Sequence, residues 1–159
     1  MPERSATGLQ ELIDREAIRD LVHRYCWAVD RGTLLEVMTL FHDSCDLVLI
    51  PGKRYTGRAA VQKWYDGYMQ NRMAVLRHLI HNQVIVLERD TATSKSYFDA
   101  VGELKGESIV VAGFYEDVLR RVEENWRFTE KVIRLDFLVP LQEGWGGKKF
   151  KRSLMPPED

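Results

Sequence analysis

Apolar side chains recur at three- and four-residue steps through the first part of the chain. The positions are Leu9, Leu12, Ile13, Ala17, Ile18, Leu21, Val22, Tyr25 and Val29. This spacing places them along one side of an α-helix. Thr7 and Gln10 have the spacing of a capping box at the helix start, and Gly32 provides a stop. The pattern therefore predicts a loose leader over residues 1–6 and then one helix of about twenty residues.

Two shorter segments with helical spacing follow, with one buried strand between them. The first runs from Leu34 to Phe41, and a turn at residues 42–44 leads into the apolar strand Asp46–Ile50. Pro51 and Gly52 stop that strand. A third helix opens at Gly57 and Arg58, and its apolar stripe is largely aromatic: Val61, Trp64, Tyr65 and Tyr68. Such a stripe is more often core than ligand pocket, and here it predicts a helix that covers an opening or a sheet face.

From about Met73 the pattern changes to that of strands. Four apolar or alternating segments are joined by short polar turns: Leu76–Leu87, Thr91–Val101, Ser108–Arg121 and Trp126–Phe137. Short turns indicate antiparallel neighbours, so the strands form a meander. Helices first and strands last predict an α+β fold, in which a cone-shaped, curled antiparallel sheet and three N-terminal helices enclose an apolar pocket. We interpret residues 1–159 as a single domain, with a core over about residues 9–141 and an irregular tail over 142–159.

Charge and cysteine content narrow the class of protein. The net charge of −1 over 159 residues disfavours a nucleic-acid binder, and we interpret the basic run Lys148, Lys149, Lys151 and Arg152 as a solvated tail. No apolar run reaches the roughly 18 residues of a membrane span, and the N-terminus lacks a signal-peptide core. Cys26 and Cys45 have no metal-ligand spacing. We therefore expect a cytoplasmic protein with reduced thiols and no membrane partner.

Few ionisable side chains fall in apolar surroundings: Tyr25, Asp30, His78, His81, Asp99, Arg134 and Asp136. Asp30 stands at a helix C-terminus, where the helix dipole opposes a carboxylate, so local stability is a poor reason for its presence. His78 and His81 are three residues apart on one strand and should face opposite sides of the sheet. At most one of them points into the pocket unless a bulge intervenes. A single strand histidine is also commonly a hydrogen-bonded structural residue.

An aspartate beside a histidine suits proton abstraction, because the carboxylate sets the imidazole tautomer and stabilises the imidazolium. A neighbouring tyrosine can donate a hydrogen bond to a developing oxyanion. These groups are typical of eliminations, dehydrations and keto–enol isomerisations. The chain contains no serine nucleophile elbow, Walker loop, dinucleotide fingerprint or HExxH motif. The opposed faces of His78 and His81 disfavour a metal site that would combine them with Asp30.

Several short motifs, taken in order, resemble the SnoaL-like branch of the nuclear-transport-factor-2-like superfamily. They are Ala17-Ile18-Arg19-Asp20-Leu21 followed by Tyr25, Asp30 and Gly32; Leu40-Phe41-x-Asp43; Tyr55-x-Gly57-Arg58; Arg77-His78-x-x-x-Asn82; and Trp126-Arg127-Phe128. Within the branch, the chain is similar to scytalone dehydratase, hexachlorocyclohexane dehydrochlorinase and bile acid 7α-dehydratase. The resemblance implies the fold more than an activity, because this fold hosts enzymes, binding modules and structural subunits.

The resemblance assigns roles to residues. It implies that Asp30 and His78 are the acid/base dyad and that Tyr25 holds the oxygen charge or assists the leaving group. The pocket would be walled by Cys26, Val29, Trp64, Tyr68 and Leu76, with Arg134 as an anion or carbonyl contact. The strand Asp46–Ile50 lacks the tyrosine that two of the dehydratases carry, and Leu49 stands where ketosteroid isomerase has its aspartate base.

Three hypotheses follow for the function. The first is a cofactor-independent lyase of the dehydratase type, which acts on a small cyclic hydrophobic substrate. The second is an isomerase or polyketide cyclase that uses the same dyad without loss of water. The third is non-catalytic: a small subunit of an aromatic-ring-hydroxylating dioxygenase or a ligand carrier. The family likeness also implies a homodimer or homotrimer.

Overall fold

The computed structural model of the protein describes residues 3–73, 75–144 and 146. Its three helices are α1 (Glu3–Arg31), α2 (Leu34–Thr39) and α3 (Arg58–Gln70). The strands are β1 (Phe41–Ile50), β2 (Arg54–Thr56), β3 (Leu76–Glu88), β4 (Thr91–Leu104), β5 (Glu107–Val122) and β6 (Asn125–Pro140), followed by a short 3-10 helix, Leu141–Glu143. No helix among the described residues is long and apolar enough to cross a membrane.

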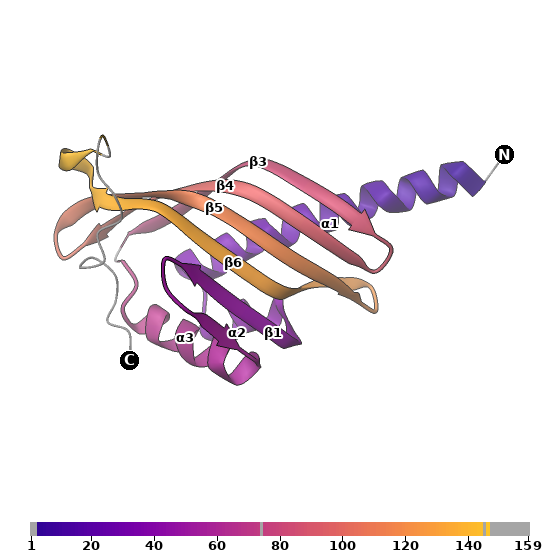
Figure 1. Cartoon of the computed structure of the whole chain (residues 1–159), viewed down its shortest axis with the longest axis horizontal. Coiled ribbons are helices and arrows are strands. Elements are labelled where there is room, and N and C mark those ends of the chain that lie inside the picture. Colours follow the sequence, from indigo (N-terminus) through magenta and orange to yellow (C-terminus); the bar gives the residue numbers. More distant parts are fainter. Residues whose placement is uncertain (1–2, 74, 145, 147–159) are drawn as a thin grey trace.

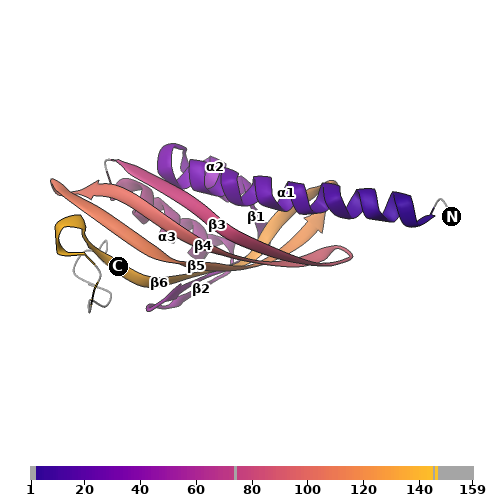
Figure 2. The ribbon, with the colours of Figure 1, turned by 90° about the horizontal axis from the view of Figure 1, so that it is seen from above.

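The six strands form one curled, unclosed sheet in the order β2-β1-β6-β5-β4-β3. Strands β3 to β6 make the predicted antiparallel meander, which confirms the α+β fold class. Two features of the sheet differ from the prediction. Strand β1 pairs parallel to β6, and the short strand β2, which lies after the Pro51–Gly52 stop, adds an antiparallel edge. Helix α1 lies along one side of the sheet, and its N-terminal turns extend past the strands (Figures 1 and 2).

The first two helices begin or end at other residues than the pattern predicted. Helix α1 starts at Glu3, so residues 3–6 are not a loose leader and Thr7 lies inside the helix. Residues 3–6 contain neither proline nor glycine, so the helix extends N-terminally through the apparent cap. Helix α2 stops at Thr39, and residues 42–44, predicted as a turn, belong to β1, where the pairing with β6 is irregular. The basic run at residues 148–152 lies outside the described residues.

The core fills the space between α1 and the inner face of the sheet. The stripe that predicted α1 is buried from Ile18 onward, whereas Leu9, Leu12 and Ile13, nearer the N-terminus, are exposed. Along β4 the even-numbered side chains face inward and the odd-numbered ones outward. The inner face thus presents a continuous surface to the helices, and the outer face presents a second surface to solvent.

Helix α1 also covers the free edge of β3, the last strand of the sheet. Arg15 donates from Nη1 to the carbonyl oxygen of Ile85 at 2.6 Å, and Asp30 Oδ2 accepts from the backbone nitrogen of His78 at 2.9 Å. An exposed strand edge invites pairing with other chains. The Arg15 and Asp30 side chains therefore form hydrogen bonds with backbone groups of β3 that would otherwise be unpaired at the sheet edge.

The buried carboxylate of Asp14 on α1 forms hydrogen bonds with side chains of β5 and β6. Asp14 accepts hydrogen bonds from Arg121 Nη2 at 2.5 Å, from the Trp126 indole at 3.3 Å and from Gln10 at 3.3 Å. Burial by itself raises the pKa of Asp14, but these donors outweigh it and the net shift is downward. The carboxylate therefore stabilises the fold in its charged form.

We expect Asp14→Asn to lower the free energy of unfolding by about 1–2 kcal/mol at neutral pH, because the charged hydrogen bonds to Arg121 become neutral. A depressed folded-state pKa gives stability that is complete above the ordinary value of 3.8 and is lost as the pH falls through the lowered value. The difference between variant and wild type should therefore shrink in strongly acidic buffer. Urea unfolding at several pH values measures it.

Asp20→Asn is the matched control on the same helix, since the contact found for Asp20 among the described residues is an exposed ion pair with Arg24 at 3.8 Å. It should change stability by less than about 0.5 kcal/mol. Equal losses in the two variants, or a loss at Asp14 that stays constant with pH, would contradict this account of the contact.

Candidate active site

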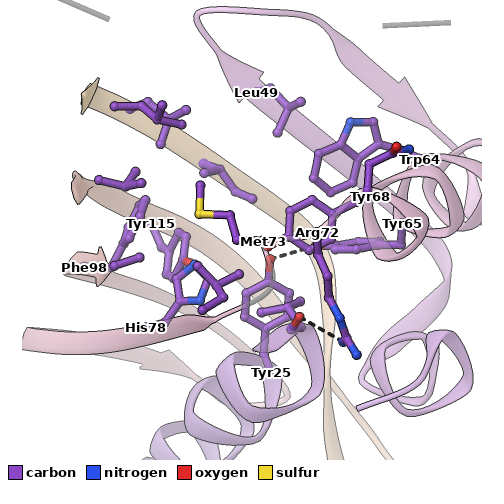
Figure 3. Close-up of a pocket in the computed structure, with 18 of the residues that line it drawn as sticks. Tyr25, Leu49, Trp64, Tyr65, Tyr68, Arg72, Met73, His78, Phe98 and Tyr115 are labelled. Carbon is purple, nitrogen blue, oxygen red and sulfur yellow. Dashed lines mark hydrogen bonds between the residues drawn. The ribbon is translucent and has the colours of Figure 1, made fainter. Parts of the chain in front are cut away.

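A mostly apolar cavity of about 120 Å³ lies between α1, α3 and the inner face of the sheet. Figure 3 shows His78, Phe98 and Tyr115 on its strand side and Trp64 and Tyr68 on its helix side. Other lining side chains are Tyr25, Val29, Leu49, Tyr65, Arg72, Met73, Leu76, Ile133 and Leu135. An apolar chamber with a few polar groups at its wall is the usual form of a small-molecule site.

The structure brings Asp30 and His78 into direct contact at the wall of this cavity. His78 Nδ1 lies 2.6 Å from Asp30 Oδ1, and Asp30 Oδ2 accepts from the His78 backbone nitrogen at 2.9 Å. The two side chains are only 11% and 9% exposed. A carboxylate can only accept, so the ring proton is on Nδ1, which donates a hydrogen bond to Asp30. The lone pair of the neutral ring then lies on Nε2.

Arg72 holds the end of the helix that carries Asp30. Its Nη1 donates to the carbonyl oxygen of Gly32 at 3.1 Å and to that of Val29 at 3.5 Å (Figure 3 marks a bond of Arg72). Val29 lies in the last turn of α1 and Gly32 directly follows the helix, where backbone carbonyls have no intrahelical partner. A cation there also offsets the dipole that opposes the Asp30 carboxylate. Arg72 therefore fixes the backbone on both sides of Asp30.

Three buried tyrosines face the cavity from different elements. Tyr65 of α3 donates to the Tyr25 hydroxyl of α1 at 3.0 Å, and the Tyr115 ring of β5 packs edge-on against the Tyr25 ring with centroids 5.9 Å apart. Burial raises the pKa of Tyr25, Tyr65 and Tyr115 well above the ordinary phenol value. All three hydroxyls thus remain protonated and are able to donate hydrogen bonds.

The predicted wall residues separate into two groups. Val29, Trp64, Tyr68 and Leu76 line the cavity. Cys26 is buried but does not line it, because it lies on the neighbouring side of α1, where burial raises the pKa of its thiol to about 12. The prediction of Cys26 as a wall residue is therefore corrected, because its side chain packs in the core behind the cavity.

Arg134 is a second correction. It lies between Ile133 and Leu135, which line the cavity, and strand alternation turns it to the outer face. There its Nε contacts Glu116 Oε2 at 2.6 Å. His81 faces outward as well: its Nε2 lies 3.2 Å from Asp99 Oδ2, and both side chains are about half exposed. The prediction that His78 and His81 face opposite sides is confirmed.

Sequence reasoning missed an inward-facing pair on the central strands, Asp117 of β5 and Lys131 of β6. Both side chains are completely buried, and Lys131 Nζ lies 3.0 Å from Asp117 Oδ1. Alternation from Tyr115 would have placed Asp117 inward. Simple alternation along β6 does not place Lys131 inward. The pairing of β5 with β6 shifts between Val118 and Leu119, and this shift changes the face on which the following β6 residues lie.

The arrangement of Asp30, His78 and Tyr25 suits removal of a proton from a carbon atom and stabilisation of the resulting oxygen charge. Among the described residues, no group of three or more histidine, cysteine, aspartate and glutamate side chains is close enough to hold a metal ion.

Comparisons with known proteins agree with this architecture. The family model of the SnoaL-like domain matches residues 10–132. A comparison with curated proteins finds no match. A solved structure of a proposed scytalone dehydratase from Novosphingobium aromaticivorans superposes with a TM-score of 0.75 at 22% identity, covering 82% of this chain and 89% of the other.

Two further solved structures are similar. The hexachlorocyclohexane dehydrochlorinase LinA-type3 from Novosphingobium barchaimii has a TM-score of 0.75 at 20% identity, covering 91% of this chain and 98% of its own. A proposed aromatic ring hydroxylase from Novosphingobium aromaticivorans has a TM-score of 0.74 at 27% identity, covering 83% and 96%. At the lower identities the likeness establishes the shared fold.

Proposed function

Because the chain belongs to the SnoaL-like domain family, we propose that it is a cofactor-independent, dehydratase-like lyase acting on a small cyclic hydrophobic substrate. The observation that carries the proposal is the 2.6 Å contact of His78 Nδ1 with Asp30 Oδ1 at the wall of an apolar cavity. The fold shared with a proposed dehydratase and with a dehydrochlorinase supports an elimination. A cytoplasmic location remains part of the proposal.

In this mechanism His78 Nε2 takes a proton from a carbon atom next to a carbonyl or similar activating group. Asp30 stabilises the imidazolium, and Tyr25 donates a hydrogen bond to the oxygen that gains negative charge. The electrons of the C–H bond form a carbon–carbon double bond as the bond to the leaving group breaks. The imidazolium then returns the proton to the leaving group, so that water or HX is released and the protein is unchanged.

The cavity limits the size of the substrate. A cavity of ~150 Å³ in another protein accepts benzene, and the one here measures about 120 Å³. Its walls are mainly aromatic and aliphatic. The geometry therefore favours a single-ring substrate over a polycyclic one.

We expect the protein to eliminate water or HX from one member of a panel of single-ring β-hydroxy and β-chloro ketones. Mass spectrometry of the products measures the loss, and a His78→Gln protein is the control for background elimination. Turnover without change of mass would instead identify the isomerase or cyclase alternative. Equal elimination by the wild type and the control would contradict the proposed site.

A non-catalytic role is the second candidate, favoured by the 27% identity to a proposed aromatic ring hydroxylase. In that role the chain would be a small subunit of an aromatic-ring-hydroxylating dioxygenase, or a carrier that uses the same cavity for ligand binding. Co-purification of the tagged chain from its host with a larger iron–sulfur subunit would support the subunit role. A homo-oligomer that purifies without other chains would count against it.

We also propose that the protein is a homodimer or homotrimer formed through the outer face of the sheet. That face exposes apolar side chains of β3, β4 and β5 that a monomer leaves in water: Leu79, Val84, Val86, Tyr97, Val101 and Val118. Val86→Lys should shift the native mass toward the monomer because it places a charge in this surface. Light scattering coupled to size exclusion measures the shift; a wild-type monomer would contradict the proposal.

A further inference from the structure

A complete ion pair is buried behind the cavity, and the proposed mechanism gives it no role. Lys131 of β6 and Asp117 of β5 are both 0% exposed in their side chains, with Lys131 Nζ at 3.0 Å and 3.3 Å from the two Asp117 oxygens. Neither residue lines the cavity. The pair is therefore shielded from both solvent and direct ligand contact.

The ammonium group lies against the rings that separate it from the cavity. Lys131 Nζ is 3.8 Å from the ring centroid of Tyr115, 4.1 Å from that of Tyr25 and 4.7 Å from that of Phe128. Tyr25 and Tyr115 also line the cavity. The positive end of the ion pair thus stands directly behind the two phenols that a bound ligand would meet.

A gain in folding stability is a weak explanation for the burial of Lys131 and Asp117. Both ions lose their hydration, and replacing such a pair by apolar side chains of similar volume is often neutral or stabilising. The hydrogen bonds found for Lys131 Nζ among the described residues both go to Asp117. Its remaining N–H is left to the aromatic faces, which attract a cation through their negative quadrupole.

A fixed positive charge in a water-poor interior has a strong effect on negative charge that appears nearby. The groups that face Lys131 are Asp117, which holds it, the neutral phenols of Tyr25 and Tyr115, and the Cys26 thiol. Of these, Tyr25 lines the cavity, and its hydroxyl accepts a hydrogen bond from Tyr65, which leaves its own O–H able to donate to a ligand. The charge of Lys131 therefore acts on a ligand through Tyr25.

We propose that Lys131 is a positioning residue whose ammonium, held by Asp117, stabilises a negatively charged ligand oxygen bound at Tyr25. The cavity would accordingly take single-ring ligands whose carbonyl or phenol oxygen carries negative charge, as in an enolate. This assignment rests on the proposed function for the place of that oxygen. It goes beyond the proposed function by naming the charge that the site recognises and the buried pair that provides it.

4-Nitrophenol is a suitable probe, because it has one ring and its visible absorbance distinguishes the phenolate from the phenol. Titration of the wild-type protein with the probe over a range of pH should show that the bound probe ionises at lower pH than the free probe. In the double variant Lys131→Met with Asp117→Leu, phenolate affinity should fall about tenfold, with a smaller change for the neutral phenol. Lys131→Gln with Asp117→Asn removes both charges while keeping two hydrogen-bonding groups, and should lose the same factor.

Arg134→Met with Glu116→Leu is the matched control, because it removes an ion pair from the same two strands on their outer face. It should bind the phenolate as the wild type does. Unchanged phenolate affinity in a folded charge-free variant would overturn the proposal, as would a wild-type protein that leaves the probe unaffected. Probe binding requires no elimination, so turnover in the β-hydroxy ketone panel can succeed or fail independently of this result.

Discussion

A protein with glutamine in place of His78 should turn over its substrate about 10² to 10⁴ times more slowly than the wild type. Glutamine keeps hydrogen-bonding atoms near Asp30 but cannot accept a proton from carbon at neutral pH. Because His78 Nε2 is assigned to the chemical step, the loss should appear in kcat, with KM little changed. Steady-state kinetics with the substrate identified by product mass measures both constants.

Asp30→Asn should lower kcat within the same range for a different reason. The asparagine oxygen can still accept from the His78 backbone nitrogen, so the helix end can stay in place. Its amide group, however, would donate to Nδ1 and so move the ring proton to Nε2, where the base is needed.

The pair His81 and Asp99 is the matched control, since it is a second histidine–aspartate contact made by a β3 histidine, here with an aspartate of β4, at 3.2 Å on the outer face. His81→Gln and Asp99→Asn should each leave kcat within about twofold of the wild type. Near-full activity in both the His78 and the Asp30 variants would exclude the dyad as the acid/base group.

Asp117→Leu should cost about 3–5 kcal/mol in the free energy of unfolding, the largest stability loss that we expect here. The substitution leaves the Lys131 ammonium buried without its counter-ion, and uncompensated buried charge is costly. Burial already lowers the pKa of Lys131 in the wild type even though Asp117 opposes this shift. Denaturant unfolding of Asp117→Leu, Lys131→Met and the double variant measures the pairwise contribution.

The sign of the pH dependence follows from that lowered pKa. Between the folded value and the ordinary lysine value of 10.5, the unfolded chain binds more protons than the folded protein. The stability of Asp117→Leu should therefore rise as the pH increases toward 10.5, while the double variant should show no such rise. A double variant as unstable as the single one would show that packing, and not charge, explains the loss.

The sequence predicted the elements with strong periodic patterns well. The third helix and the four long strands appear close to their predicted residues, because apolar alternation and short turns are local signals. The proximity of Asp30 and His78 was predicted mainly from the resemblance to the SnoaL-like branch. The residues alone indicated that a carboxylate at a helix end is locally unfavourable, but they did not select its partner.

Features that depend on non-local pairing were not predictable in the same way. The parallel pairing of β1 with β6 joins segments far apart in the chain. The shifts in the pairing of β5 with β6 change which side chains face the cavity, and they account for both the wrong place of Arg134 and the missed Lys131. Cys26 was misplaced because a helical stripe identifies a buried side without saying which part of that side borders a cavity.

Asp30 binds both the backbone nitrogen and the imidazole ring of His78. Hydrogen exchange at that backbone nitrogen can therefore be used to measure whether the site is assembled. The backbone nitrogen of His78 is protected by Asp30, and not by a neighbouring strand, so its hydrogen exchanges with deuterium only when the end of α1 separates from the sheet. The exchange rate of that single amide thus reports the fraction of molecules in which the site is assembled. It can be followed before any substrate is known.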